Sequence, residues 1–146
     1  MYLADDVKDK INSAKERWPK TLINSLGIEF ESIKKDELIA KMPVDERTKQ
    51  PFGILHGGAN VALAETLASI GGWLNATEDK PNVVGLEINA NHLRAVAKGH
   101  VTGVAKPIHI GRNTQVWEVN ITNEENKLTC ISRCSLFATN LSKKSK

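Results

Sequence analysis

The longest apolar stretch of the chain lies near its middle and predicts a buried helix over residues 57–75. Apolar side chains occur there on nearly every side of a helical wheel, from Val61 to Leu74. A helix that is apolar all round is normally buried all round. We therefore expect this helix to form the centre of the fold.

Strand patterns lie on both sides of this segment. Short alternating stretches at 28–31 and 38–42 predict a strand pair before the helix. Consecutive strands without crossover helices form antiparallel sheets. The pattern therefore predicts an α+β fold, an antiparallel sheet wrapped around one long central helix. Four of its strands are expected after the helix, at 83–94, 100–106, 114–122 and 128–139.

The chain is expected to divide into three parts. Residues 1–27 form an N-terminal helical extension, residues 28–139 form one domain, and residues 140–146 form a basic flexible tail. Within the extension Pro19 is expected to end an amphipathic helix. Its apolar positions follow helical spacing and are Val7, Ile11, Ala14 and Trp18.

Composition narrows the function classes. The 146 residues are 40% hydrophobic and 25% charged, and the net charge of +3 with 5% aromatic residues gives no reason to expect a nucleic-acid partner. No apolar run approaches the roughly 20 residues of a membrane span, so no membrane partner is expected. The charged N-terminal residues do not resemble a signal peptide, which favours a cytoplasmic location.

The two cysteines, Cys130 and Cys134, fall on the same face of one predicted strand. At about 3.3 Å per residue they lie about 13 Å apart. A disulfide normally requires Cα atoms within about 7 Å, so we expect two buried, reduced thiols.

The predicted central helix begins with His56-Gly57-Gly58. The first amides of a helix lack intrahelical partners and carry partial positive charge. Glycines at this point allow a phosphate or a developing oxyanion to approach these amides. The alternative is that Gly57 and Gly58 only permit tight packing of the helix on the sheet.

Glu65 lies within the apolar stretch, where burial of a carboxylate is unfavourable. Ionisable groups in such positions are enriched at active sites. Alternatively, Glu65 points into solvent or pairs with a distant Lys or Arg. Ser69, one turn later on the same face, has a hydroxyl that could hold the carboxylate or a ligand, or bond to a carbonyl of its own helix.

The spacing of these residues predicts an oligomer. His56 and Glu65 are nine residues apart, which corresponds to about 13.5 Å along one helix. One carbonyl carbon cannot contact both. If both residues are catalytic, one of them comes from a second subunit, and a two-fold dimer supplies two such composite sites.

Other kinds of catalytic site find little support. The remaining histidines, His92, His100 and His109, lack metal-ligand spacing, so neither a metal site nor a cofactor is expected. There is no GxSxG motif and no cysteine motif for nucleophilic chemistry. Candidates for phosphate contact, which are equally explained as ordinary surface charges, are Arg94, Lys98, Lys106 and Arg112.

Several motifs together resemble hotdog-fold acyl-CoA thioesterases of the phenylacetate type. The run RTKQPFGILHGGA over residues 47–59, followed by Leu63-Ala64-Glu65, carries most of the likeness. The stretches 84–92 and 106–111 also look like this family. The resemblance covers residues 26 to 138 and implies the hotdog arrangement of helix and sheet.

The resemblance implies a role for each motif residue. Gln50 and His56 match the pair that contacts the thioester carbonyl and the region of the leaving sulfur. Gly57 matches the amide that polarises the carbonyl. Glu65 matches the catalytic carboxylate, contributed by the facing subunit, and Ser69 the hydroxyl that assists it. These positions are occupied as the family pattern requires.

The family also implies partners. Its members are commonly tetramers built from two dimers, so a homo-oligomer with shared sites is expected. The substrate implied is an acyl- or aroyl-CoA. Its expected contacts, some of them loosely aligned with the family pattern, are Gly58, His92, Arg94, Gly111, Arg112 and Thr114.

The expected reaction is hydrolysis of the thioester to the free acid and CoA. Glu65 either attacks the carbonyl carbon, giving a mixed anhydride, or deprotonates a water that attacks. Two alternatives remain: a hydratase or dehydratase using a His and Glu pair, and a non-catalytic acyl-CoA-binding module. The order QPFGILHGG followed by Glu65 favours hydrolysis.

Overall fold

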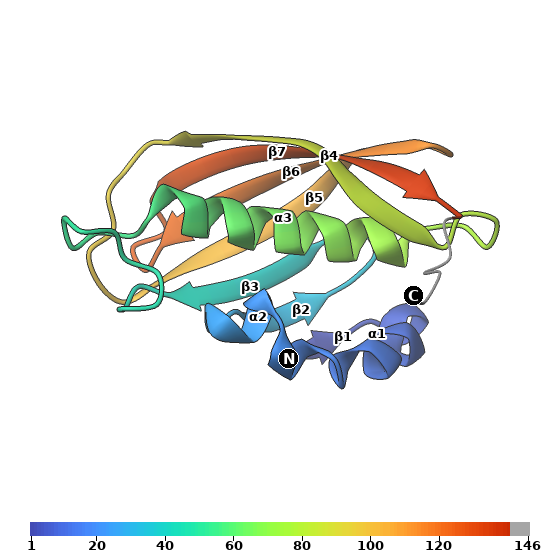
Figure 1. Cartoon of the computed structure of the whole chain (residues 1–146), viewed down its shortest axis with the longest axis horizontal. Helices are drawn as coiled ribbons and strands as arrows, with labels where there is room; N and C mark the ends of the chain where they lie inside the picture. The colour runs from blue at the N-terminus through green and yellow to red at the C-terminus, as the bar shows by residue number, and fades with distance from the viewer. Residues whose placement is uncertain (141–146) are drawn as a thin grey trace, which may run out of the picture.

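The computed structural model describes residues 1–140, and its centre is helix α3 (Gly57–Leu74), which lies along a seven-stranded sheet (Figure 1). The strand order is β1-β2-β3-β5-β6-β7-β4. The predicted α+β architecture, with one long central helix on a mainly antiparallel sheet, is confirmed. The strands are β1 (Tyr2–Leu3), β2 (Glu29–Ile33), β3 (Leu38–Pro43), β4 (Asn82–His92), β5 (His100–Ile110), β6 (Thr114–Asn123) and β7 (Leu128–Thr139).

Two strands differ from the prediction. The two-residue β1 pairs in parallel with β2 and was not predicted, because so short a strand shows no alternation. Strand β5 continues past residue 106 to Ile110. Pro107 lies at a bulge in the pairing of β5 with β6, where the loss of an N–H donor is tolerated.

The N-terminal residues form four short helical segments beside β2 and next to α3 (Figure 1). They are η1 (Asp5–Val7), α1 (Lys8–Lys15), η2 (Trp18–Lys20) and α2 (Leu22–Ser25). The predicted amphipathic helix is therefore shorter than expected. Pro19 does not end it but lies in the first turn of η2, where its missing N–H is not needed.

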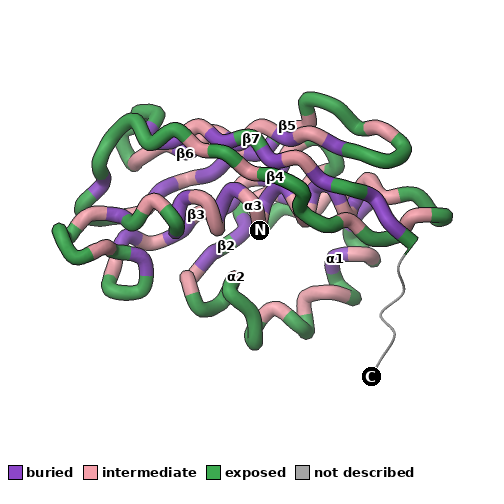
Figure 2. Tube along the Cα trace, turned by 45° about the horizontal axis from the view of Figure 1, so that its top comes forward, coloured by how far each residue is buried: buried purple, intermediate pink, exposed green. Residues whose placement is uncertain are grey.

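Helix α3 buries only one of its sides within the chain, because buried and intermediate residues alternate along it with helical spacing. Figure 2 colours the chain by this burial. The fully buried side faces the sheet and includes Leu63 and Leu67. The prediction of burial on all sides is wrong for the single chain, because the sheet covers the helix on one side. The other side is half-buried and carries Val61, Ala62, Glu65, Thr66, Ser69, Ile70 and Trp73.

A pair of buried polar side chains fixes α3 on the sheet. Gln115 donates from Nε2 to the carbonyl of Gly72 at 3.1 Å and accepts from Trp117 Nε1 at 3.0 Å. The Trp117 ring packs against Gly71, where an added Cβ would lie 2.5 Å from the ring. The orientation of α3 is therefore set near its C-terminal end by shape and by hydrogen bonds.

Within residues 1–140, strand β4 forms one end of the sheet and pairs only with β7. Its register shifts at a bulge between Gly85 and Glu87. The bulge leaves Val84 and Leu86 exposed, at 51% and 59%, although the alternation in the sequence continues. An unpaired strand edge with exposed apolar side chains is a surface on which another chain can pair.

Three further predictions concern the cysteines, membrane-spanning segments and the C-terminal tail. Cys130 and Cys134 are buried and free, as predicted. Within residues 1–140, no helix has the length and apolar content needed to cross a bilayer. The predicted basic tail lies outside the described residues, except for Asn140.

Candidate active site

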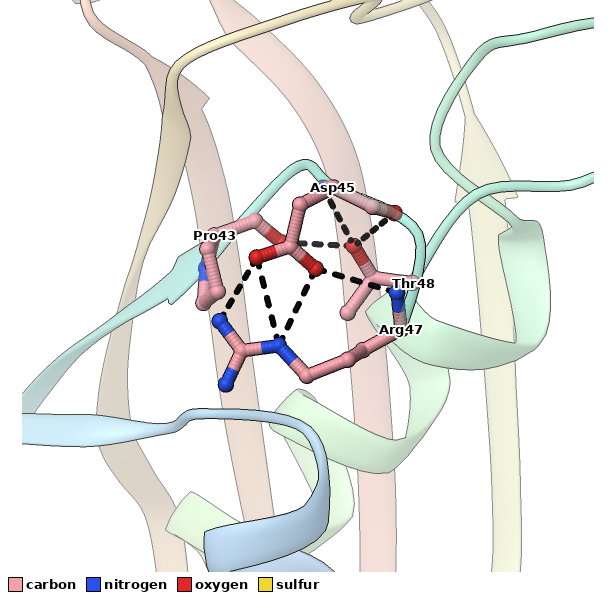
Figure 3. A network of polar contacts seen from close by, with 4 residues as sticks. All are labelled: Pro43, Asp45, Arg47 and Thr48. Atoms are coloured by element: carbon pink, nitrogen blue, oxygen red, sulfur yellow. Dashed lines mark hydrogen bonds and ion pairs between the residues drawn. The ribbon is translucent and has the colours of Figure 1, made fainter.

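A polar network ties together the loop between β3 and α3 (Figure 3). Thr48 donates from Oγ1 to the Pro43 carbonyl at 2.6 Å and accepts from the Asp45 amide at 3.2 Å. Arg47 donates to both carboxylate oxygens of Asp45, which holds the pKa of that carboxyl below its ordinary value. The Thr48 carbonyl accepts from the His56 amide at 2.8 Å, so the network fixes the residue that starts α3.

The side chain of His56 caps α3. Its Nδ1 accepts from the Gly58 amide at 2.8 Å. A neutral imidazole that accepts at Nδ1 carries its hydrogen at Nε2, so His56 keeps one N–H to offer. The capping role was missed from the sequence because histidine is not among the favoured N-cap residues.

Gly57 provides the amide predicted to polarise a carbonyl. Among residues 1–140 this N–H has no acceptor. A Cβ on Gly57 would lie 2.8 Å from His92 Nε2, so the glycine also admits the ring of a β4 side chain. The glycine therefore allows close packing, and its amide is left without an acceptor in the described residues, as an oxyanion site would require.

The side chain of Gln50 is oriented by its own loop. Its Oε1 accepts from the Phe52 amide at 2.5 Å. The amide nitrogen then remains as the available donor, with no acceptor in the described part of the chain. The structure brings four predicted site residues together around a cavity of about 360 Å³: Gln50, Gly57, His92 and Arg94.

Asn60 lines the same cavity and was not predicted. The residue is 5% exposed, and its Oδ1 has no hydrogen-bond partner. Buried polar atoms are normally paired, and exceptions are often found at functional sites. One signal in the sequence could have identified Asn60, a polar residue one turn after Gly57 on the side of α3 that faces the sheet. The strong apolar pattern around it obscured this signal.

Glu65 lies in a different cavity, of about 530 Å³, between α2 and the half-buried side of α3. Gly58 and Ser69 line it as well, as does Leu22 of α2. Neither the carboxylate of Glu65 nor the hydroxyl of Ser69 has a hydrogen-bond partner within residues 1–140. Within residues 1–140 Glu65 pairs with no Lys or Arg, and its side chain is half-buried.

Within one chain the two halves of the predicted site stay apart. Gly57 and Glu65 are eight residues apart on α3, which corresponds to about 12 Å along the helix axis. They also line separate cavities. A single substrate carbonyl therefore cannot contact both residues of the same chain.

The structure places the remaining predicted contacts at the far end of the sheet. Gly111 and Arg112 follow β5, and Thr114 begins β6. The end of β5 is about 33 Å from His100, which is on the side of the α3 N-terminus. Arg112 forms an ion pair with Asp79 at 3.6 Å. These three are not brought to Gly57 within the chain.

The remaining candidates for catalytic chemistry are a metal site and the buried cysteines. Among residues 1–140, no three His, Cys, Asp or Glu side chains are arranged to hold a metal ion. Burial raises the pKa of the Cys134 thiol to about 11, and the nearby carboxylates of Glu65 and Glu87 add to the shift. Cys134 is therefore a protonated thiol at neutral pH and a poor nucleophile.

Residues 52–130 match the thioesterase superfamily. Close relatives by sequence include two proteins whose names state a thioester-hydrolysing activity. The 1,4-dihydroxy-2-naphthoyl-CoA hydrolase of Escherichia coli K12 is 54% identical over 112 residues, covering 77% of this chain and 82% of that protein. The proofreading thioesterase EntH of Cronobacter turicensis is 54% identical over 115 residues, covering 79% and 83%.

Solved structures agree with this assignment. A thioesterase from Haemophilus influenzae superposes with a TM-score of 0.83 at 50% identity, covering 92% of this chain and 94% of that chain. The PaaI protein of Escherichia coli gives a TM-score of 0.81 at 20% identity, covering 94% and 97%, which is a likeness of fold. The chain belongs to the thioesterase superfamily and has its hotdog fold, so the predicted family and the prediction of a thioester-hydrolysing enzyme are confirmed.

Proposed function

We propose that this chain hydrolyses an acyl- or aroyl-CoA to the free acid and CoA, with Glu65 as the catalytic carboxylate. The observation that carries the proposal is the bare amide of Gly57 at the N-terminus of an 18-residue helix. Such an amide binds the oxygen of a thioester carbonyl and stabilises the negative charge that develops on it. Relatives whose names include a naphthoyl-CoA hydrolase and a thioesterase support a CoA ester as the substrate.

We assign three donors to the substrate thioester. The Gly57 amide and the Gln50 side-chain amide polarise the carbonyl oxygen. His56, whose ring lines a neighbouring cavity with Thr48 and Gly58, is assigned to donate from Nε2 toward the sulfur as the C–S bond breaks. Asn60 Oδ1, which is buried and unpaired, accepts from an N–H of the ligand or from a water.

Glu65 supplies the other half of the reaction. As a general base, it takes a proton from water while the hydroxide attacks the carbonyl carbon, and it then returns the proton to the CoA thiolate. As a nucleophile, it forms a mixed anhydride that water hydrolyses in a second step. Both routes consume one water and release one acid and one thiol. Ser69, one turn further along α3, orients the carboxylate or the water.

The proposed site is composite, with Glu65 of one subunit facing Gly57 of another. Three observations support a homodimer. Glu65 and Gly57 line separate cavities in one chain. Strand β4 offers an unpaired edge with exposed Val84 and Leu86. Phe52, beside Gln50, is 91% exposed, and an exposed aromatic side chain is typical of an interface.

Two finer points of the proposal rest on the family resemblance and on the cysteines. We propose that two such dimers assemble into a tetramer, as family members commonly do. We also propose a cytoplasmic location, consistent with two buried free thiols.

The direct test is thiol release by the variant Glu65→Gln. The substitution keeps the size of the side chain and removes both the base and the nucleophile, so kcat should fall by at least about 10²-fold while CoA-ester binding persists. Glu118→Gln on β6 is the matched control and should retain activity, because Glu118 lies in neither cavity. Thiol release by Glu65→Gln near that of the unmodified protein would refute the role of Glu65. A change in enoyl absorbance without thiol release would instead identify a hydratase.

A further inference from the structure

A second cavity adjoins the Glu65 cavity along the same side of α3. The second cavity measures about 550 Å³ and lies between α1, η2 and the C-terminal end of α3. Ile70 lines both cavities, so the two are adjacent. Trp73 lies eight residues, or about 12 Å, along the helix from Glu65, and its ring forms part of the second cavity.

Lys10 of α1 reaches into this second cavity and lacks an acidic partner. Its Nζ donates to the Trp73 carbonyl at 2.6 Å and lies 4.8 Å from the centre of the Trp73 ring. An ammonium has three N–H donors, so at least one further donor remains for a ligand. Among residues 1–140, no carboxylate lies within ion-pair distance of Lys10. Burial, with a contribution from nearby Lys35, lowers its pKa, as expected for a cation without a counter-ion.

A second cation lines the cavity. Arg17 follows α1, is exposed, and has no ion-pair partner within the described residues. The cavity also contains one carboxylate, that of Glu78, which is exposed and forms no ion pair there. Trp18, next to Arg17, also lines the second cavity, and its ring packs against Phe30 with 5.0 Å between the ring centres. Two cations against one anion leave the cavity with a net positive charge.

We propose that the second cavity binds an anionic group at the far end of the acyl chain, held by Lys10 and Arg17. The inference rests on the proposed thioesterase function, because the reacting carbonyl then lies at Glu65. The acyl chain would follow the half-buried side of α3 past Ile70 to the ring of Trp73. The preferred substrates are therefore CoA esters that carry a carboxylate distal to the thioester, such as suberyl-CoA and sebacyl-CoA.

The test compares matched substrates on the full-length protein. Suberyl-CoA and octanoyl-CoA have chains of the same length and differ in the terminal carboxylate. We expect kcat/KM to be higher for suberyl-CoA, and we expect the ratio between the two substrates to fall roughly tenfold in Arg17→Gln and in Lys10→Met. Arg17 makes no contact that the fold needs, so Arg17→Gln remains informative even if Lys10→Met is unstable. Lys20→Gln is the control, because Lys20 lies in the same N-terminal region but outside the cavity, and it should leave both substrates unchanged.

The outcomes separate this inference from the proposed function. If octanoyl-CoA is hydrolysed as fast as suberyl-CoA, or if Arg17→Gln leaves the ratio unchanged, the anionic subsite is refuted and the thioesterase function stands. Equal losses for both substrates in Arg17→Gln would assign the cations to a phosphate of CoA and likewise overturn the acyl subsite. If no CoA ester releases thiol, the proposed function fails, and the inference fails with it.

Discussion

A Cβ atom on Gly85 would lie 2.6 Å from Oε1 of Glu65. The carboxylate therefore rests against bare backbone of β4, at the bulge between Gly85 and Glu87. Bulges often occur where a strand must adjust to an active site. This contact, and not a hydrogen bond, defines where the Glu65 side chain lies within the chain.

The first prediction concerns this contact. Gly85→Ala should displace the Glu65 carboxylate and lower kcat by roughly 10- to 100-fold, because a small misplacement of a catalytic group weakens its alignment with the reacting carbon. The exposed edge position should keep the fold intact, which circular dichroism would verify. An unchanged kcat would show that the carboxylate moves without consequence or that Glu65 is not catalytic.

The second prediction separates the two roles of His56. His56→Ala removes the cap of α3 and should lower the free energy of unfolding by about 1 kcal/mol. His56→Asn keeps a capping side chain and should restore most of that stability, as measured by urea denaturation. Neither variant keeps the Nε2–H donor, so both should lose activity. Recovery of full activity in His56→Asn would mean that His56 acts only as a cap.

The sequence predicted the fold well because the hydrophobic pattern is strong where the structure is regular. The residues of α3 and the last four strands follow the predicted order, since each buries one side on a common core. Prediction failed where the local pattern is weak or misleading. The two residues of β1 show no period, and the bulge at Gly85 shifts β4 so that Val84 and Leu86 turn outward.

The candidate site could be derived from the sequence only in part, for a physical reason. Glu65 and the His56-Gly57 helix start were detectable because a carboxylate and bare amides are conspicuous in an apolar helix. The unpaired Oδ1 of Asn60 and the contact between the Glu65 carboxylate and Gly85 depend on how elements far apart in the chain pack together. The spacing of residues within one segment does not predict such contacts.

The third prediction follows from the raised pKa of Cys134. In the unfolded chain this thiol ionises near its ordinary value of 9.0, whereas in the native state it ionises at about 11. Between these values the unfolded state binds fewer protons, so the free energy of unfolding should fall as pH rises from about 9 and then level off. In Cys134→Ala the fall between about pH 8 and pH 11 should be smaller by up to about 2 kcal/mol.

Cys130 provides the comparison for that experiment. Burial raises its pKa as well, and no carboxylate contributes to the shift. Cys130→Ala should therefore reduce the alkaline loss of stability less than Cys134→Ala does. Equal pH profiles for Cys134→Ala and the unmodified protein would contradict the assigned environment of Cys134.

The fourth prediction tests the composite site itself. Glu65→Gln and His56→Asn should each be inactive as pure proteins, because every site in them lacks either the carboxylate or the imidazole. In a mixed dimer one site receives both damaged residues and the other receives neither. Unfolding and refolding an equimolar mixture should therefore restore about one quarter of the unmodified thiol-release activity, since half of the dimers are mixed and each has one intact site.

The mixing experiment discriminates because a site made within one chain cannot be repaired in this way. If Glu65 and His56 of the same chain served one site, every site in the mixture would still carry one defect, and no activity would return. The unmodified protein refolded alone is the control for recovery of the fold. Full activity in a stable monomer of the unmodified chain would also exclude the shared site, because about 12 Å of α3 separates Glu65 from the Gly57 amide.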